Sequence, residues 1–418
     1  MKRLFKQIWK FLLSFGPGLF CIGYTMGTGS VTSMVKAGSD YGSALLWVLL
    51  LSCLFSFVLM EAYGRYAVVT GGTAIHGIRT KLKGGKYLAI LVAIGIVLGQ
   101  WSCLSGILSI TSNAVGELIG MFMPGVQNTY LLTLLVVTSI ILIMYFILVR
   151  GDYSLFEKVL VVLVTVMGVA FLISMFVVLP PASQIASGFI PSIPNTPGAR
   201  LMIAAFVGTT MAAPTFVVRP LLLKEKGWSV ADVKRQTKDS LFSASLMFVI
   251  SASIMLTAVG VLYADGKVVT KVLDMVYILE PVAGRFAVAL FIVGLMSAGL
   301  SSIFPILMVA PLMISDYKKG EMDTKTSSFK YITAIAALVG LTIPVLGFNP
   351  IIAQVATQVA NVFVLPLVSG LIILLVNKKE DMKAYKAGYL LNAGLIAAFL
   401  FSCIIAYNGV LSLIELLK

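Results

Sequence analysis

Hydrophobic blocks recur from one end of the chain to the other, with short polar segments between them. A helix needs about 20 consecutive apolar residues to cross a hydrocarbon core about 30 Å thick. Because lipid cannot satisfy exposed backbone groups, blocks of this length predict membrane-spanning helices and an all-α polytopic membrane protein. The blocks place eleven spans at 11–35, 43–69, 86–120, 129–149, 155–180, 200–225, 238–263, 281–315, 329–347, 351–376 and 387–412.

The first block follows a short basic segment that contains Lys2, Arg3, Lys6 and Lys10. Basic residues ahead of an apolar block are also typical of a secretory signal peptide. The apolar stretch is too long for such a peptide, and no convincing cleavage site follows it. We therefore expect the first block to be retained as a span.

The chain carries 31 basic and 17 acidic residues, which gives a formal net charge of +14. The basic residues concentrate in alternate loops, at 79–86, 224–238, 318–330 and 378–386. By the positive-inside rule these loops and the N-terminus are cytoplasmic, and an odd number of spans places the C-terminus outside. The basic excess therefore indicates orientation in the cytoplasmic (inner) membrane, and we expect no nucleic-acid partner.

Residue types that bind metal ions or act as nucleophiles are scarce in this sequence. Cys21, Cys53, Cys103 and Cys403 lie inside spans at unrelated spacings, which favours packing over a metal knuckle or a disulfide framework. The single histidine, His76, lies in a loop. A phosphate-binding loop motif does not occur, so we expect neither a cofactor nor a catalytic site, and the chain is not predicted to be an enzyme.

Two spans are interrupted at their centres by residues that weaken helices. The first carries "GTGS" at 27–30, and the sixth carries "GTTMAAPTFVVRP" at 208–220. One Gly-x-Gly alone is more often a close-packing motif. Two interruptions five spans apart instead indicate an inverted-repeat transporter with its substrate between the breaks. We expect one domain, 1–418, with repeats at about 11–180 and 200–376 and an extra span at about 387–412.

Five segments carry a family resemblance. They read "GPGLFCIGYTMGTGSVTS" from Gly16, "VTGGTAIHGIR" from Val69, "GDYSLFEKVLVVLVTVMGVAFL" from Gly151, "FIVGLMSAGLSS" from Phe291 and "ATQVANVFVLP" from Ala356. Together they strongly resemble the NRAMP family (natural resistance-associated macrophage proteins), in order and over nearly the whole chain. The resemblance implies the LeuT-type fold of five plus five spans with an eleventh, and secondary-active, usually proton-coupled, import of divalent transition-metal ions.

This sequence departs from the family at the metal-binding positions. The family's Asp-Pro-Gly-Asn motif falls on "GTGS" at 27–30, so the carboxylate and the amide ligand are missing. The family's Met-Pro-His motif falls on "AAP" at 212–214, although Met211 lies one residue earlier. The family's ligand positions thus fall on Gly27, Ser30, Thr209 and Ala212, none of which has a strong side-chain ligand.

Further departures concern protons and charge. A second family histidine corresponds to Arg219, and the third span has no acidic residue before Glu117 near its outer end. Gln358 in the tenth span and the backbone around Thr209 still match the family pattern. Proton coupling is therefore predicted to be weak or absent. The expected substrate-binding residues are Gly27, Thr28, Gly29, Ser30, Thr209, Ala212, Ala213, Arg219 and Gln358.

The chemistry of these residues leaves two substrate classes open. A dry transition-metal ion needs carboxylate, imidazole or thioether ligands, and a dication at mid-bilayer without a counter-charge is very costly. A divalent ion that keeps part of its water, with Mg²⁺ favoured over Mn²⁺ or Fe²⁺, suits hydroxyl and carbonyl donors. A small organic or amino-acid-like solute could instead place a carboxylate at the free amides of the broken helices.

Other polar residues have two possible roles each. Arg219 either faces the cavity, where it would favour an anion, or snorkels to the cytoplasmic face with Lys224 and Lys226. Glu61, four residues before Arg65, is expected to form a local ion pair. Two polar faces either line a wet pathway or bond neighbouring helices. They comprise Ser105, Ser109 and Ser112 in span three, and Gln354, Gln358 and Asn361 in span ten.

These observations predict an alternating-access transporter with a remodelled substrate site. Its partners are expected to be the lipid bilayer and a small ion or molecule, and it is expected to be a monomer. A divalent metal ion is the first substrate class and a carboxylate-bearing solute the second. A non-transporting binding or sensing protein ranks third, because no attached soluble domain supports it.

Overall fold

The computed structural model describes residues 16–123, 125, 130–150, 153–196, 198–264, 266, 269–270, 274 and 280–416. Within these ranges the regular structure is helical and no strand occurs. The start of the first predicted span, at 11–15, lies outside the described residues, and so do the basic residues before it, Lys2, Arg3, Lys6 and Lys10.

The first half of the chain forms five predicted spans, of which the first is divided. Its helices are α2 Gly16–Thr25, α3 Thr28–Tyr41, α4 Leu46–Thr70, α5 Ala74–Lys81, α6 Gly85–Phe122, α7 Tyr130–Val149, α8 Tyr153–Val177 and the short α9 Ala182–Ser187. The loop helix α5 lies between spans two and three, and α9 follows span five.

The second half repeats this order with a divided first member. Its helices are α10 Ala199–Thr210, α11 Ala213–Glu225, η1 Val230–Asp232, α12 Val233–Ala258 with the π-turn η2 Val259–Tyr263, α14 Glu280–Lys319, α15 Ser327–Gly340, α16 Thr342–Leu346, α17 Pro350–Val362, α18 Leu365–Asn377, α19 Lys379–Met382, η4 Lys383–Tyr385 and α20 Tyr389–Leu416.

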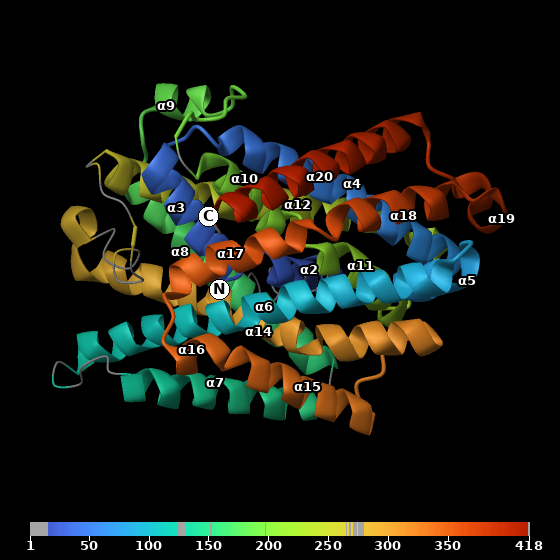
Figure 1. Cartoon of the computed structure of the whole chain (residues 1–418), viewed down its shortest axis with the longest axis horizontal. Helices are drawn as coiled ribbons and strands as arrows, with labels where there is room; N and C mark the ends of the chain where they lie inside the picture. Colours follow the sequence, from blue (N-terminus) through green and yellow to red (C-terminus); the bar gives the residue numbers. More distant parts are fainter. Residues whose placement is uncertain are drawn as a thin grey trace, which may run out of the picture.

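Ten helical segments of the described chain are long and apolar enough to cross a membrane. They match the second to eleventh predicted spans, and α2 with α3 makes up the first. The divided helices lie in the interior: α2 is buried along its whole length, and so is nearly all of α10 and α11. Figure 1 shows α7 and α15 along one edge of the bundle, with α6 and α14 between them and α2.

Local chemistry explains where the two divided spans break. Met26 and Gly27 separate α2 from α3, and Gly27 has extended backbone angles of φ −89° and ψ −174°. Met211 and Ala212 separate α10 from α11, where Pro214 in the first turn cannot donate a backbone hydrogen bond. The break in span one is thus shorter than the predicted 27–30, because Thr28 to Ser30 already belong to α3.

The tenth span is divided as well, which the hydrophobic pattern did not predict. Between α17 and α18 the chain leaves the helix at Phe363 and Val364, just before Pro366 in the first turn of α18. A proline here removes one donor from the helical ladder and so favours a new helix start.

Candidate substrate site at the two helix breaks

Hydrogen bonds join the two breaks to each other and to span three. The hydroxyl of Thr209, near the end of α10, donates to the carbonyl of Thr25 at the end of α2, at 3.1 Å. Thr28, the first residue of α3, donates from its hydroxyl to the carbonyl of Ile107 in α6, at 3.4 Å. The predicted residues Thr28 and Thr209 therefore lie at one buried junction of α2, α3, α6 and α10.

The carbonyls at the C-terminal ends of α2 and α10 are already bound by hydroxyls from other spans. Ser302 of α14 donates to the carbonyl of Gly23, Thr209 to that of Thr25, and Ser56 of α4 to that of Thr210 at 3.1 Å. The last carbonyls of a helix carry its negative partial charge and could otherwise coordinate a cation. Three of them each accept a side-chain hydrogen bond, which leaves one lone pair on each oxygen for another group.

The N-terminal ends of α3 and α11 are arranged differently. Their capping residues, Gly27 and Ala212, offer no side-chain hydrogen bond to the first turns of these helices. The first amides of a helix carry its positive partial charge and have no partner within the helix. Both positive helix ends therefore meet the breaks without a side-chain cap.

A cluster of amide side chains on α6 and α17 closes one side of the first break. Gln100 donates to Asn361 at 3.2 Å, and Asn361 donates to Gln358 Oε1 at 3.1 Å. These bonds direct the Gln358 amide nitrogen toward Gly29, where a Cβ atom would collide with it. The structure therefore brings Gln358 and Gly29 together.

The remaining predicted residues add few ligands. The Ser30 hydroxyl donates to the thioether of Met26 at 3.8 Å, and Ser251 donates to the same sulfur at 3.2 Å. Ala212 and Ala213 are buried beside Met211 and contribute no polar side-chain atom. In the part of the chain that the structure describes, three or more His, Cys, Asp or Glu residues do not gather anywhere to hold a metal ion.

Arg219 is fully buried in α11, so the alternative that it snorkels to the cytoplasmic face is wrong. Its Nη2 atom lies 2.7 Å from Asp239 Oδ2 in α12. The same nitrogen donates to Ser240 Oγ at 2.9 Å and to the carbonyl of Gln236 at 3.2 Å. The positive charge of Arg219 is thus matched by a neighbouring span, and the substrate does not need to match it.

The charge pair continues into a network that reaches α4. Gln236 donates to Glu61 Oε2 at 2.6 Å, and Arg65 Nη2 lies 2.6 Å from Glu61 Oε1. The predicted local pair of Glu61 and Arg65 is therefore confirmed. The network joins α4, α11 and α12 behind the second break.

Sequence reasoning missed Asp239 and Gln354. Asp239 lies at the start of a predicted span, next to Lys238. An acidic residue at that position is typical of a polar loop, so the sequence does not indicate a buried partner. The signal that could have found it is that a buried arginine needs an acidic partner on an adjacent span. The sequence predicts Gln354 as part of a polar face of span ten and does not distinguish it as a site residue.

His76 lies in α5, away from the breaks. Asp316 of α14 accepts hydrogen bonds from the backbone amides of Ile75 at 3.0 Å and His76 at 3.2 Å. Burial, together with the nearby charges of Arg79 and Lys224, lowers the pKa of His76 below its ordinary value of 6.5. This histidine is therefore neutral at neutral pH and belongs to the anchoring of the loop helix.

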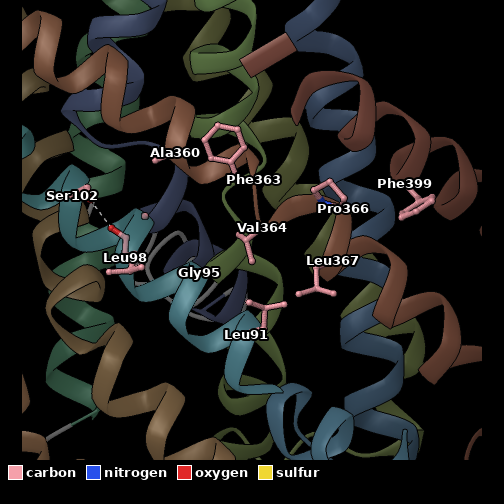
Figure 2. A pocket seen from close by; sticks show the side chains of 11 residues that line it. Leu91, Gly95, Leu98, Ser102, Ala360, Phe363, Val364, Pro366, Leu367 and Phe399 are labelled. Carbon is pink, nitrogen blue, oxygen red and sulfur yellow. Dashed lines mark hydrogen bonds between the residues drawn. The ribbon is translucent and has the colours of Figure 1, made fainter. Parts of the chain in front are cut away.

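An apolar cavity of about 690 Å³ lies between α6, the α17–α18 link and α20. Figure 2 shows the lining side chains: Leu91 and Leu98 come from α6, Phe363 and Val364 from the α17–α18 link, and Phe399 from α20. Leu91 and Leu98 are 57% and 62% exposed, so this cavity opens at the outer surface of the bundle. It is separate from the polar junction at the breaks.

A family model described as natural resistance-associated macrophage protein-like matches residues 18–412. Among curated relatives, "Divalent metal cation transporter MntH" of Ralstonia nicotianae is 26% identical, over 96% of this chain and 91% of that protein. The protein of the same name from Caldanaerobacter subterraneus is 22% identical, over 91% of this chain and 88% of that protein.

Solved structures share the fold. The Eremococcus coleocola manganese transporter aligns with a TM-score of 0.73 and 18% identity, over 97% of this chain and 87% of that one. MhsT in complex with L-phenylalanine aligns with a TM-score of 0.62 and 18% identity, over 95% and 98% of the two chains. Both likenesses extend over nearly the whole chain, which establishes the LeuT-type fold.

Proposed function

Since the chain belongs to the NRAMP family, a family of metal-ion transporters, we propose that it transports a divalent cation which keeps part of its water shell. Mg²⁺ is favoured over Mn²⁺ and Fe²⁺. The substrate site is the junction of the two breaks, and access alternates between the two sides of the cytoplasmic membrane.

The observation that carries this proposal is the ligand chemistry at the junction. Two thioethers, those of Met26 and Met211, lie in the breaks, and the Met26 sulfur accepts hydrogen bonds from Ser30 and Ser251. Gly27 and Ala212 stand where a soft-metal site would need a carboxylate and a thioether, and the polar side chains near them are hydroxyls and amides. Such groups cannot replace the water of a transition-metal ion, but they can hydrogen-bond to water that the ion retains. Mg²⁺ loses water reluctantly and so suits this site.

Proton coupling is proposed to be weak or absent. The buried acids described near the second break, Glu61 and Asp239, are bound to Arg65 and Arg219. Each of these carboxylates is already engaged by a guanidinium, so neither is a free acid placed to pass a proton through the junction. His76 lies outside the spans, so it cannot relay a proton through the junction.

One observation favours a second substrate class, a small organic carboxylate. The carbonyls of Gly23, Thr25 and Thr210 each accept a hydrogen bond from a hydroxyl, whereas the positive ends of α3 and α11 have no side-chain cap. Helix N-termini of this kind bind carboxylates. MhsT, which has the same fold, was solved in complex with L-phenylalanine.

Uptake into proteoliposomes separates these substrates. Purified protein is reconstituted and tested with Mg²⁺, Mn²⁺, Ca²⁺ and a panel of amino acids and organic acids, with a lumenal pH dye. Saturable Mg²⁺ uptake without acidification of the lumen is expected. Uptake of a carboxylate but of no divalent ion would overturn the cation proposal and support the second class.

The membrane orientation is also part of the proposal. The basic loops meet at one end of the bundle: Lys81 lies 2.6 Å from Asp381, and Lys224 donates to the carbonyl of Gly320 at 2.9 Å. This gathering supports a cytoplasmic location for that end and for the N-terminus, with the C-terminus outside. Cysteine accessibility at Lys383 from each side of the membrane tests it.

A further inference from the structure

Gln354 and Gln358 lie one helical turn apart on α17 and have the same side chain but unequal partners. The Gln358 amide is held through its oxygen by Asn361, which Gln100 holds in turn. The Gln354 side chain is fully buried, and neither its oxygen nor its nitrogen has a hydrogen-bond partner among the described residues. A buried amide without partners costs free energy, so this residue calls for an explanation.

The surroundings of Gln354 form a slot made by two glycines. A Cβ atom on Gly29, in the first turn of α3, would collide with the Gln354 amide nitrogen. A Cβ atom on Gly106 of α6 would collide with the Gln354 amide oxygen. The amide therefore spans the gap between span three and the first break, directly beside the uncapped end of α3.

Bonding between helices does not account for this amide. The hydrogen bonds between α6 and α17 run through Gln100, Asn361 and Cys103, one to two turns farther along α17. Thr357 bonds only the backbone carbonyl of Gln354. The Gln354 side chain forms no hydrogen bond to α3 or α6 and is available to bind a group that enters between them.

We propose that Gln354 is a substrate-contacting residue that determines specificity, because its unpartnered amide lies at the first break between Gly29 and Gly106. The inference rests on the proposed function in taking the junction as the transport site. A half-turn of the Gln354 amide breaks no hydrogen bond, because neither its oxygen nor its nitrogen has a partner among the described residues. It places the oxygen on the Gly29 side, where the oxygen would accept a hydrogen bond from water on a hydrated cation. The side chain carries no charge, so it holds the hydration shell and does not compete for the bare ion.

Transport by Gln354→Leu and Gln354→Glu tests the contact, with Mg²⁺ as the probe in proteoliposomes. Gln354→Leu is expected to raise the KM for Mg²⁺ about tenfold, as the loss of one hydrogen bond to a charged species would do. Its melting temperature should stay the same or rise, because no internal hydrogen bond is lost. Gln354→Glu should lower the KM for Mg²⁺ by adding a counter-charge.

Gln236→Leu is the matched control, since Gln236 is a buried glutamine bonded to Glu61. This change should lower the melting temperature and leave the ratio of Mg²⁺ to Ca²⁺ uptake unchanged. An unchanged KM in Gln354→Leu, with normal Mg²⁺ uptake by the wild type, would overturn the inference but leave the proposed function standing.

The accessibility of residue 354 to a thiol reagent tests the inference independently of Mg²⁺ transport. A wild type that carries no Mg²⁺ would count against the proposed function alone. In a variant without native cysteines, Gln354→Cys should react with a small water-borne thiol reagent. Ser369→Cys is the control, because Ser369 is as buried as Gln354 but meets Ser402 between α18 and α20, away from the breaks that alternating access would open. Equal protection of both positions would contradict a place for Gln354 on the substrate pathway.

Discussion

The guanidinium of Arg219 lies 2.7 Å from the carboxylate of Asp239, and both side chains are buried, with exposures of 0% and 1%. The pair joins the second half of the broken sixth span to the seventh span. Removing two charges from water is costly, so each charge depends on the other. The pair therefore fixes how α11 packs behind the second break.

Breaking this pair should destabilise the protein strongly. Asp239→Asn and Arg219→Met, each alone, are expected to lower the free energy of unfolding by about 3–5 kcal/mol, because each leaves one buried charge unmatched. The double change Arg219→Met with Asp239→Leu should recover much of the loss. Thermal unfolding in detergent measures the three variants, and equal losses in the singles and the double would contradict the coupling.

The span limits could be predicted from the sequence, and the contacts between spans could not. Apolar blocks and the Gly and Pro residues at 27 and 214 are local signals, so the predicted spans agree with α4 to α20 within a few residues. The Arg219–Asp239 pair and the slot around Gln354 depend on which helices pack together. No periodicity within one helix encodes that packing.

Gly29 is predicted to be important for uptake, because an added Cβ would push the amide ends of Gln354 and Gln358 out of the slot that they occupy. Gly29→Ala should destabilise the fold by about 1–3 kcal/mol through overpacking and abolish uptake. Gly388→Ala is the control, since no atom lies within 4 Å of its added Cβ. Measuring uptake and melting temperature for both variants checks this, and normal uptake by Gly29→Ala would disprove the slot.

The bond from Thr209 to the Thr25 carbonyl should stabilise the junction of the breaks. Thr209→Val keeps the shape but removes the donor, and is expected to cost about 1–3 kcal/mol by leaving a buried carbonyl unpaired. Thr209→Ser keeps the hydroxyl and should lose less. Denaturant unfolding compares the two, and an equal loss in both would mean that the methyl group, and not the bond, matters.

The folded state should lose stability in acid because His76 becomes protonated. Because its folded pKa is lowered from 6.5, the folded state favours the neutral imidazole. The contribution of this residue is therefore present above its unfolded pKa and is lost as the pH falls below it. The melting temperature of the wild type should drop between about pH 7 and about pH 5 more than that of His76→Gln. Identical pH profiles would contradict this assignment.

A transition-metal site should be recoverable by restoring ligands at the first break. Gly27→Asp with Ser30→Asn supplies a carboxylate and an amide oxygen, which suit Mn²⁺. The extended backbone angles of Gly27 are open to any residue. A Cβ at this position would lie 2.8 Å from the Cβ of Ser302, so the variant also carries Ser302→Gly to make room. Isothermal titration should show Mn²⁺ binding in the triple variant, whereas Ser302→Gly alone should show none.

The central claim is that the junction of the two breaks does not hold a dehydrated transition-metal ion. The most direct test is uptake of Mn²⁺ at micromolar concentration into proteoliposomes, beside uptake of Mg²⁺ at millimolar concentration by the same preparation. The account predicts saturable Mg²⁺ uptake and no saturable Mn²⁺ uptake. Saturable Mn²⁺ uptake at micromolar concentration would contradict it.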